Sequence, residues 1–305
     1  MKKGLIFVAA GFLMYATSCK ETLAPSGPKT VDTMATDSSY VDAVEKPQDK
    51  VVYIEEFTGV RCPNCPTGAS TIETIIEAHP KQVVSLSFHV GQKMTAPIEQ
   101  NKQDFRPDQG DIMVQSIWGA EVEVKPNATF DRDFLNGSTS IMQNTYTSWP
   151  GVFAADLAKN PTTPVNLYLT SSYNKTTGRY DIVATVKYTQ DISYSHALNI
   201  YISEDGIVDA QELSPVEIID DYVFNHVFRK TLTDPTSGEI ILPDMATKQK
   251  GLVYIYRTSL KIDPTVKSQS LWNPDNMKVT AFVNVNNKPA DGHVLQVVQT
   301  NLKGE

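Results

Sequence analysis

The chain has 305 residues, of which 41% are hydrophobic and 20% charged, and it carries a formal net charge of −8 at pH 7. Nucleic acids bind basic protein surfaces, so this acidic balance argues against a nucleic-acid-binding protein. The length exceeds that of most single domains and favours two, and three cysteines are too few for a fold built on disulfides.

The N-terminus predicts a signal peptide over residues 1–18. Two lysines precede an apolar run over residues 4–16, which is shorter than the roughly 20 residues of a membrane-spanning helix. Cys19 follows two small residues at the end of this run, and the arrangement resembles the lipobox at which bacterial lipoproteins are cleaved and acylated. We therefore expect an exported lipoprotein with Cys19 as the lipidation site. Ordinary secretion, with Cys19 lost in the discarded peptide, is the alternative.

Residues 19–49 are rich in Thr, Ser, Pro, Asp and Lys and have no sustained hydrophobic period. This composition predicts a lipidated flexible tether. The lipid would attach the folded part of the protein to a membrane of the cell envelope.

A strand, a helix and a second strand are predicted in succession from residue 51. Residues 51–57 predict the first strand, and the helix begins near Pro66 because proline suits the first turn. Apolar residues then recur at helical spacing until Pro80, and residues 83–90 predict the second strand. This order is a βαβ unit, in which the two strands are expected to be parallel.

Four further segments complete the N-terminal half of the chain. We predict a polar connection, a short helix, a strand and an amphipathic helix, over residues 91–110, 111–118, 127–133 and 149–159. Residues 160–164, Asn-Pro-Thr-Thr-Pro, then interrupt the chain and form the best domain boundary.

Beyond this boundary the sequence predicts a β-sandwich of the immunoglobulin or fibronectin class, over residues 165–305. Six segments alternate or are rich in β-branched residues, and turn residues separate them: 165–171, 180–188, 197–203, 251–260, 278–285 and 294–300. The expected fold is therefore an α/β domain over residues 50–160 followed by an all-β domain.

The motif Cys62-Pro63-Asn64-Cys65, at the predicted strand-to-helix turn, is the best candidate for chemistry. The free amides and the dipole of a helix N-terminus stabilise a thiolate, so Cys62 is expected to be the nucleophile. Cys65 lies one turn further along and would resolve a mixed disulfide.

The order of elements around the motif resembles that of thioredoxin-like proteins. Glu56 lies six residues before Cys62, where that family commonly has a buried acid that accepts the proton of the second sulfur. Pro126, which follows Gly119 and precedes an apolar strand, is similar to the family's cis-proline. The resemblance implies that Pro126 is cis and lies beside the cysteine turn. Asn127 differs from the threonine that often follows this proline.

Three segments carry a closer resemblance: residues 55–66, the strand end Phe88-His89, and residues 225–229. They are similar to those of the outer membrane protein twenty-eight family of Bacteroidetes lipoproteins. This resemblance implies an outer membrane lipoprotein, on the periplasmic or the surface face, with a thioredoxin-like domain joined to a β domain. It brings no settled substrate.

These observations favour a thiol-disulfide oxidoreductase-like protein without a cofactor. Its partners would be exported protein thiols or disulfides, and the β domain could dock another envelope protein. The rival hypothesis is a cell-surface binding protein, such as an adhesin, in which the Cys62–Cys65 disulfide is inert.

A metal site at the motif is the other alternative, but structural zinc needs four ligands and the sequence has no second cysteine pair. His89, at the end of the second predicted strand, is expected near the cysteine turn as a candidate supporting residue. A structural histidine is the alternative for His89. We therefore predict no metal ion.

Overall fold

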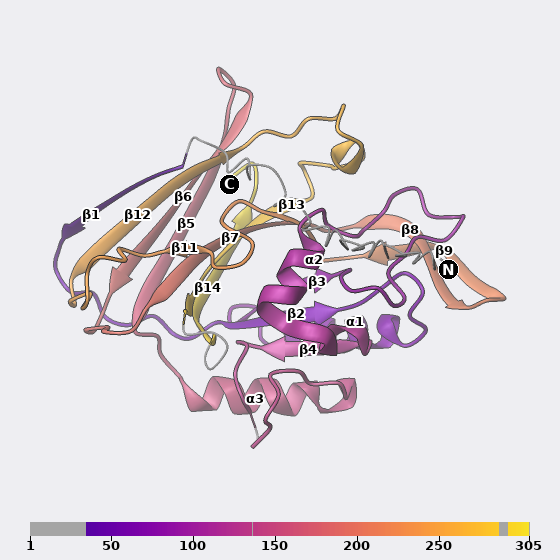
Figure 1. Cartoon of the computed structure of the whole chain (residues 1–305), viewed down its shortest axis with the longest axis horizontal. Coiled ribbons are helices and arrows are strands. Elements are labelled where there is room, and N and C mark those ends of the chain that lie inside the picture. Colours follow the sequence, from indigo (N-terminus) through magenta and orange to yellow (C-terminus); the bar gives the residue numbers. More distant parts are fainter. Residues whose placement is uncertain (1–34, 136, 287–291, 305) are drawn as a thin grey trace, which may run out of the picture. The chain divides into compact units, whose positions relative to one another are not determined.

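A computed structural model describes residues 35–135, 137–286 and 292–304 (Figure 1). The predicted signal peptide, Cys19 and the first part of the predicted tether lie outside these ranges. The helices within them are all too short or too polar to span a membrane.

The largest sheet has eight strands, seven of them in the order β14-β13-β7-β10-β3-β2-β4, with β11 paired to β7. Its strands are β2 (Val52–Phe57), β3 (Val83–Phe88), β4 (Asn127–Phe130), β7 (His196–Glu204), β10 (Val227–Thr231), β11 (Glu239–Ile240), β13 (Met277–Val285) and β14 (Val294–Asn301). As predicted, β2 and β3 are parallel. Strand β10 joins β3 to β7, with Val227 opposite Ser87. The boundary predicted at residues 160–164 therefore does not separate two sheets, because both halves of the chain contribute to this one.

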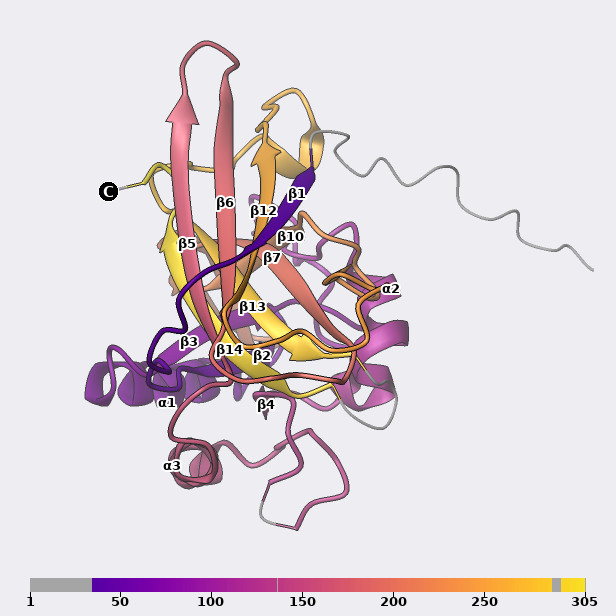
Figure 2. The ribbon, with the colours of Figure 1, turned by 90° about the vertical axis from the view of Figure 1, so that its left-hand side faces the viewer.

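A second sheet of four strands has the order β1-β12-β6-β5 (Figure 2). Its strands are β1 (Thr36–Val41), β5 (Val165–Asn174), β6 (Arg179–Tyr188) and β12 (Leu252–Leu260). Its apolar side packs against β7, β13 and β14 in one core, which includes Ile182, Ala184, Val186, Tyr254, Leu198, Ile200, Ile202, Val279, Ala281 and Val283. Two sheets that enclose a shared core form a β-sandwich, and all six strands predicted for it are present.

The prediction of a flexible tether over residues 19–49 is wrong for residues 36–41, which form strand β1. Its six residues pair with β12, from Thr36 opposite Arg257 to Val41 opposite Leu252. All six residues of β1 are exposed, so its hydropathy gives no strand signal. The pairing instead supplies backbone hydrogen bonds to the edge of β12, which a hydrophobic period does not report.

The β2-β3-β4 part of the large sheet is covered on both faces. Helices α1 (Cys65–Ala78) and α3 (Trp149–Lys159) pack on one face. The other face packs against Met113, Trp118 and Val122, which come from α2 (Gly110–Met113), a π-helical turn over Val114–Trp118 and a 3₁₀ turn over Gly119–Glu123. Short 3₁₀ turns also occur at Tyr146–Ser148 and Lys267–Gln269. Every residue of β2 is consequently buried, including Glu55 and Glu56.

The corner after β4 links the two halves of the chain. Asp131 and Arg132 both have positive φ angles, of 48° and 52°. The Asp131 carboxylate accepts a hydrogen bond from the Tyr53 amide at 2.8 Å. The main-chain carbonyl of Asp131 accepts one from the Val294 amide at 2.7 Å. The Arg132 guanidinium turns inward and forms an ion pair with Glu55. Strand β2 is thereby fixed against both β4 and β14.

Candidate functional site

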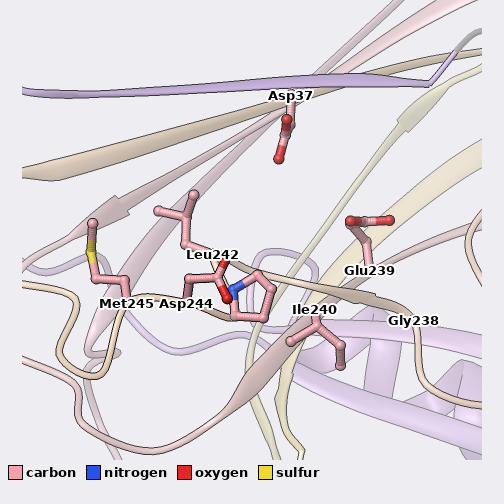
Figure 3. A pocket seen from close by; sticks show the side chains of 8 residues that line it. Asp37, Gly238, Glu239, Ile240, Leu242, Asp244 and Met245 are labelled. Atoms are coloured by element: carbon pink, nitrogen blue, oxygen red, sulfur yellow. The ribbon is translucent and has the colours of Figure 1, made fainter.

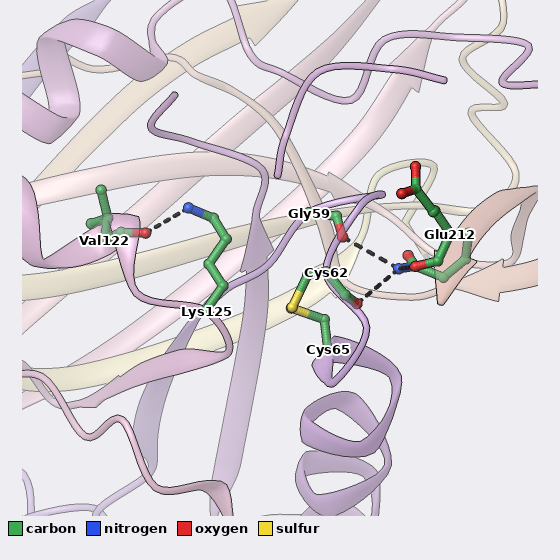
Figure 4. Close-up of a disulfide and its surroundings, with 7 residues drawn as sticks. Gly59, Cys62, Cys65, Val122, Lys125 and Glu212 are labelled. Carbon is green, nitrogen blue, oxygen red and sulfur yellow. Dashed lines mark hydrogen bonds between the residues drawn. A yellow bond between two sulfur atoms is a disulfide. The ribbon is translucent and has the colours of Figure 1, made fainter. Parts of the chain in front are cut away.

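Cys62 and Cys65 form a disulfide in the turn between β2 and α1, with their Cα atoms 5.3 Å apart (Figure 4). Helix α1 begins at Cys65 with Pro66 in its first turn, as predicted. The Cys65 amide donates to the Cys62 carbonyl at 3.2 Å, and the Gly68 amide donates to the Asn64 carbonyl at 3.1 Å. The disulfide therefore sits at the N-terminus of a 14-residue helix.

Both cysteines are buried, with exposed fractions of 0% for Cys62 and 2% for Cys65. Cys62 therefore has no solvent-accessible surface when the disulfide is formed. A hairpin of β8 (Ile207–Ser214) and β9 (Glu217–Phe224), which the sequence did not indicate, packs against the cysteine turn and the cavity beneath it. Within it, Gln211 Nε2 donates to the Cys62 carbonyl at 3.1 Å, and the Glu212 amide donates to the Val60 carbonyl at 2.8 Å.

Glu56 lies beneath the motif, in the predicted position. It lines a small cavity of about 20 Å³ together with Cys65, Ser87, His89 and others, namely Thr58, Pro66, Ala69, Gln211, Tyr222, Phe224 and Asn225. Ser87 Oγ donates to Glu56 Oε2 at 2.6 Å, while Oε1 has no hydrogen-bond partner among the described residues. Burial raises the pKa of Glu56 to about 7, against the lowering effect of the Ser87 hydrogen bond. The carboxyl group can therefore both hold and release a proton near neutral pH.

His89 lines the same cavity, so it does lie near the cysteine turn. Its ring stacks on Phe105 and meets Phe224 edge-on, and neither ring nitrogen has a hydrogen-bond partner among the described residues. Burial lowers the pKa of His89 to about 3, and the positive charges of Arg229 and Lys125 contribute. The imidazole is therefore neutral at physiological pH.

The Lys125–Pro126 peptide bond is cis, as predicted. Pro126 packs against α1 at Gly68, one turn beyond Cys65, and a Cβ atom at Gly68 would lie 2.9 Å from the Pro126 Cβ. Figure 4 shows Lys125 on the side of the disulfide opposite Glu212. Burial lowers the pKa of Lys125 to about 8. The segment before β4 thus contacts the helix that carries the disulfide.

His226, at the end of the hairpin, is part of a charged link that its sequence context did not indicate. Its ring nitrogens lie 3.3 Å from Glu73 on α1 and 3.3 Å from Asp205. Burial alone would lower the pKa of His226, but the nearby carboxylates of Asp205 and Glu73 outweigh it and raise the pKa to about 9. Residues 225–229, singled out in the sequence, therefore connect the hairpin to the helix of the motif.

No group of three or more His, Cys, Asp and Glu side chains is arranged to hold a metal ion within the described ranges. A larger pocket, of about 730 Å³, lies between β1 and the segment that follows β11 (Figure 3). Asp37, Glu239 and Asp244 contribute its charged groups, and Leu242 and Met245 contribute apolar surface. None of the site residues predicted from the sequence lines this pocket.

Two solved structures are similar to this chain, and the first of them shares its fold. HBP35 of Porphyromonas gingivalis has a TM-score of 0.61 and 15% identity, over 84% of this chain and 77% of that chain. A structural-genomics protein of Agrobacterium tumefaciens has a TM-score of 0.48 and 12% identity, over 85% and 97%. No curated protein matches the sequence.

A family comparison covers more than half of the sequence. The family model of the outer membrane protein Omp28 matches residues 125–305. This range includes Pro126, the β8–β9 hairpin and most of the sandwich, and it begins after the cysteine motif. The chain therefore belongs to the Omp28 family of outer membrane proteins.

Proposed function

We propose that this chain is an outer membrane lipoprotein that carries out thiol–disulfide exchange through Cys62 and Cys65. In this proposal residues 50–160 are a thioredoxin-like part, and exported protein thiols or disulfides are its substrates. The position of the disulfide carries the proposal, because it closes the turn before α1 beside the buried Glu56 carboxyl. The cis Pro126 against the same helix supports it.

The proposed reaction uses the reduced form of the motif. The Cys62 thiolate attacks one sulfur of a substrate disulfide and forms a mixed disulfide, and the other substrate sulfur leaves as a thiolate. Glu56 accepts the proton of the Cys65 thiol, and Cys65 then attacks the Cys62 sulfur and releases the second substrate sulfur. The substrate gains two electrons, and the motif returns to the disulfide. The reverse sequence oxidises a substrate dithiol.

Trapping of the mixed disulfide tests this reaction. The Cys65→Ser variant should accumulate a covalent adduct with an exported protein, because the resolving sulfur is missing. The adduct should be visible by non-reducing electrophoresis and disappear with DTT. The matched Cys62→Ser variant should give none, since the nucleophile is missing. If neither variant forms a DTT-sensitive adduct in the cell envelope, thiol–disulfide exchange is excluded.

The burial of both cysteines favours a second candidate function, a binding protein whose disulfide only stabilises the fold. Structural disulfides in exported proteins typically have reduction potentials below about −300 mV. Equilibration of the full mature chain with DTT at defined ratios of its reduced and oxidised forms distinguishes the two candidates. A potential within the range of the oxidoreductases, about −270 to −120 mV, supports exchange, and a lower one supports the binding protein.

Lipidation at Cys19 is a separate proposal that rests on the sequence alone. Replacing Cys19 by Ala should move the protein from the membrane fraction to the soluble fraction, because the acyl chains would be absent. Fractionation of cells followed by immunoblotting measures this change. The Cys62→Ser variant, which retains Cys19, is the control and should stay with the membrane. Equal membrane association of the Cys19→Ala variant would contradict lipidation.

A further inference from the structure

We propose that the β8–β9 hairpin is a removable cover that controls access to the Cys62–Cys65 disulfide. This inference rests on the proposed exchange function, because a cover regulates only a disulfide that reacts. Four observations carry it: the hairpin's isolation from the other sheets, its contacts with the motif, its attachment to a second segment, and the backbone at its base.

The hairpin forms a two-stranded sheet of its own, whereas the other described strands belong to the four-stranded or the eight-stranded sheet. Two-stranded hairpins are marginally stable alone and depend on contacts with their surroundings. Its outer side is open to solvent, with exposed fractions of 46% for Val208, 50% for Val223 and 96% for Val216 at the tip. Detachment of the hairpin would therefore break mainly the contacts on its inner side.

The inner side of the hairpin contacts the cysteine turn directly. Gln211 Nε2 donates to the carbonyls of Cys62 and Gly59, at 3.1 Å and 3.4 Å, and the Glu212 amide donates to the Val60 carbonyl at 2.8 Å. A small apolar cluster accompanies these bonds: Val60, Phe105, Ile207, Phe224 and Val227. A reductant that attacks a disulfide must reach a sulfur atom. Both cysteines are buried, and Gln211, Tyr222 and Phe224 of the hairpin line the cavity at Cys65. Movement of the hairpin is the route by which we infer that a reductant reaches the sulfur atoms.

The connection between β3 and α2 fastens the hairpin from a second direction. Asn101 Nδ2 donates to the Ala210 carbonyl at 2.7 Å, and the Lys102 amide donates to the Asp209 carboxylate at 3.0 Å. Neither Asn101 nor Lys102 lines the cavity at the disulfide. These bonds can therefore be removed without altering the surroundings of the sulfur atoms.

The base of the hairpin has the features of a hinge. Gly206 and His226, which flank the two strands, have φ angles of 65° and 58°. Asn225 Oδ1 accepts a hydrogen bond from the Gly206 amide at 2.9 Å, so the two connections are tied together. Beyond them, β7 and β10 pair with each other and anchor the base in the large sheet. The hairpin can thus open as a unit while its base stays in place.

The rate at which DTT reduces the disulfide of the full mature chain tests the cover. DTT becomes its cyclic disulfide and leaves Cys62 and Cys65 as thiols, which are then alkylated and counted by mass spectrometry. Loss of even one hydrogen bond makes opening about fivefold more frequent, and Gln211 and Asn101 each form two with their partners. We therefore expect Gln211→Ala and Asn101→Ala each to accelerate reduction at least about fivefold, and the double variant at least about 25-fold.

Two control variants separate local opening from other effects. Val223→Ala changes the exposed side of the hairpin and should leave the rate unchanged. Val279→Ala creates a cavity in the sandwich core, where Val279 is fully buried, and should lower global stability without accelerating reduction. Equal rates in the wild type and in Asn101→Ala would overturn the cover. So would an equal acceleration by Val279→Ala, since reduction would then follow global unfolding.

The reduction rates and the trapping experiment with Cys65→Ser give independent results, so the cover and the exchange reaction can fail separately. Faster reduction of Asn101→Ala without any trapped adduct in Cys65→Ser would establish an opening hairpin over an unreactive disulfide, and would reject regulation of exchange. An adduct together with unchanged reduction rates would support exchange and reject the cover. Faster reduction with an adduct supports both proposals.

Discussion

Replacing Glu55 by Ala should lower the free energy of unfolding by about 3–5 kcal/mol. Glu55 is fully buried in β2, where its carboxylate accepts hydrogen bonds from Arg132 at 2.6 Å and 2.9 Å. Trp118 Nε1 and Thr129 Oγ1 each donate to the same group at 2.9 Å. Without Glu55, the guanidinium of Arg132 would remain buried with no opposite charge beside it.

Urea unfolding of single and double variants measures this effect. Replacing Glu55 by Leu and Arg132 by Met together should recover most of the loss, because no uncompensated charge remains. The exposed pair of Arg106 and Asp104 supplies the control, and Arg106→Ala should change stability by less than about 1 kcal/mol. A cost below 1 kcal/mol for Glu55→Ala would show that water reaches Arg132.

The Glu56→Gln variant should be more stable than the wild type by about 3 kcal/mol at pH 8 and equally stable at pH 4. Burial raises the pKa of Glu56 from 4.5 to about 7, so folding favours the protonated form. The wild type therefore keeps its full stability below pH 4.5 and loses it as the pH rises toward 7. A shift of this size corresponds to about 3 kcal/mol. Glutamine stays neutral and avoids the loss.

Urea unfolding from pH 4 to pH 8 tests this prediction. Glu73→Gln is a control of opposite sign, because the neighbouring His226 ring lowers the pKa of Glu73, against the raising effect of burial. Its replacement should therefore destabilise the protein at pH 8. If Glu56→Gln does not raise the free energy of unfolding at pH 8, the carboxyl group of Glu56 is hydrated in the folded protein.

With both cysteines present, the Glu56→Gln replacement should also slow the release of substrate from its mixed disulfide with Cys62. A glutamine cannot accept the proton of Cys65, and loss of a general base typically costs at least about 100-fold in rate. Glu56 would then lower the stability of the fold at neutral pH and contribute to the reaction.

Local patterns in the sequence predicted the elements around the motif closely. Strand β2, helix α1 and strand β3 begin and end within two residues of their predicted bounds. Their signals lie in consecutive residues: a β-branched run, a proline in the first helical turn, and apolar positions at helical spacing. The cis bond at Pro126 followed from the family resemblance and not from any such period.

The β8–β9 hairpin was missed because its sequence carries a weak signal. Strand β9, Glu-Ile-Ile-Asp-Asp-Tyr-Val-Phe, alternates only in part, and its burial is uneven. Strand β10, which joins the two halves of the large sheet, has only five residues. The resemblance of residues 225–229 to a family segment was the one sign that this region matters.

The sequence by itself determined the βαβ unit, the position of Cys62 and Cys65 at the start of α1, and the strands of the sandwich. Each of these depends on residues close together in the chain. Only the tertiary structure decided that the disulfide is buried, that Glu56 titrates near pH 7, and that Glu55 is paired with Arg132. Burial and charge are set by distant segments, as by Gln211, which contacts Cys62 from 149 residues away.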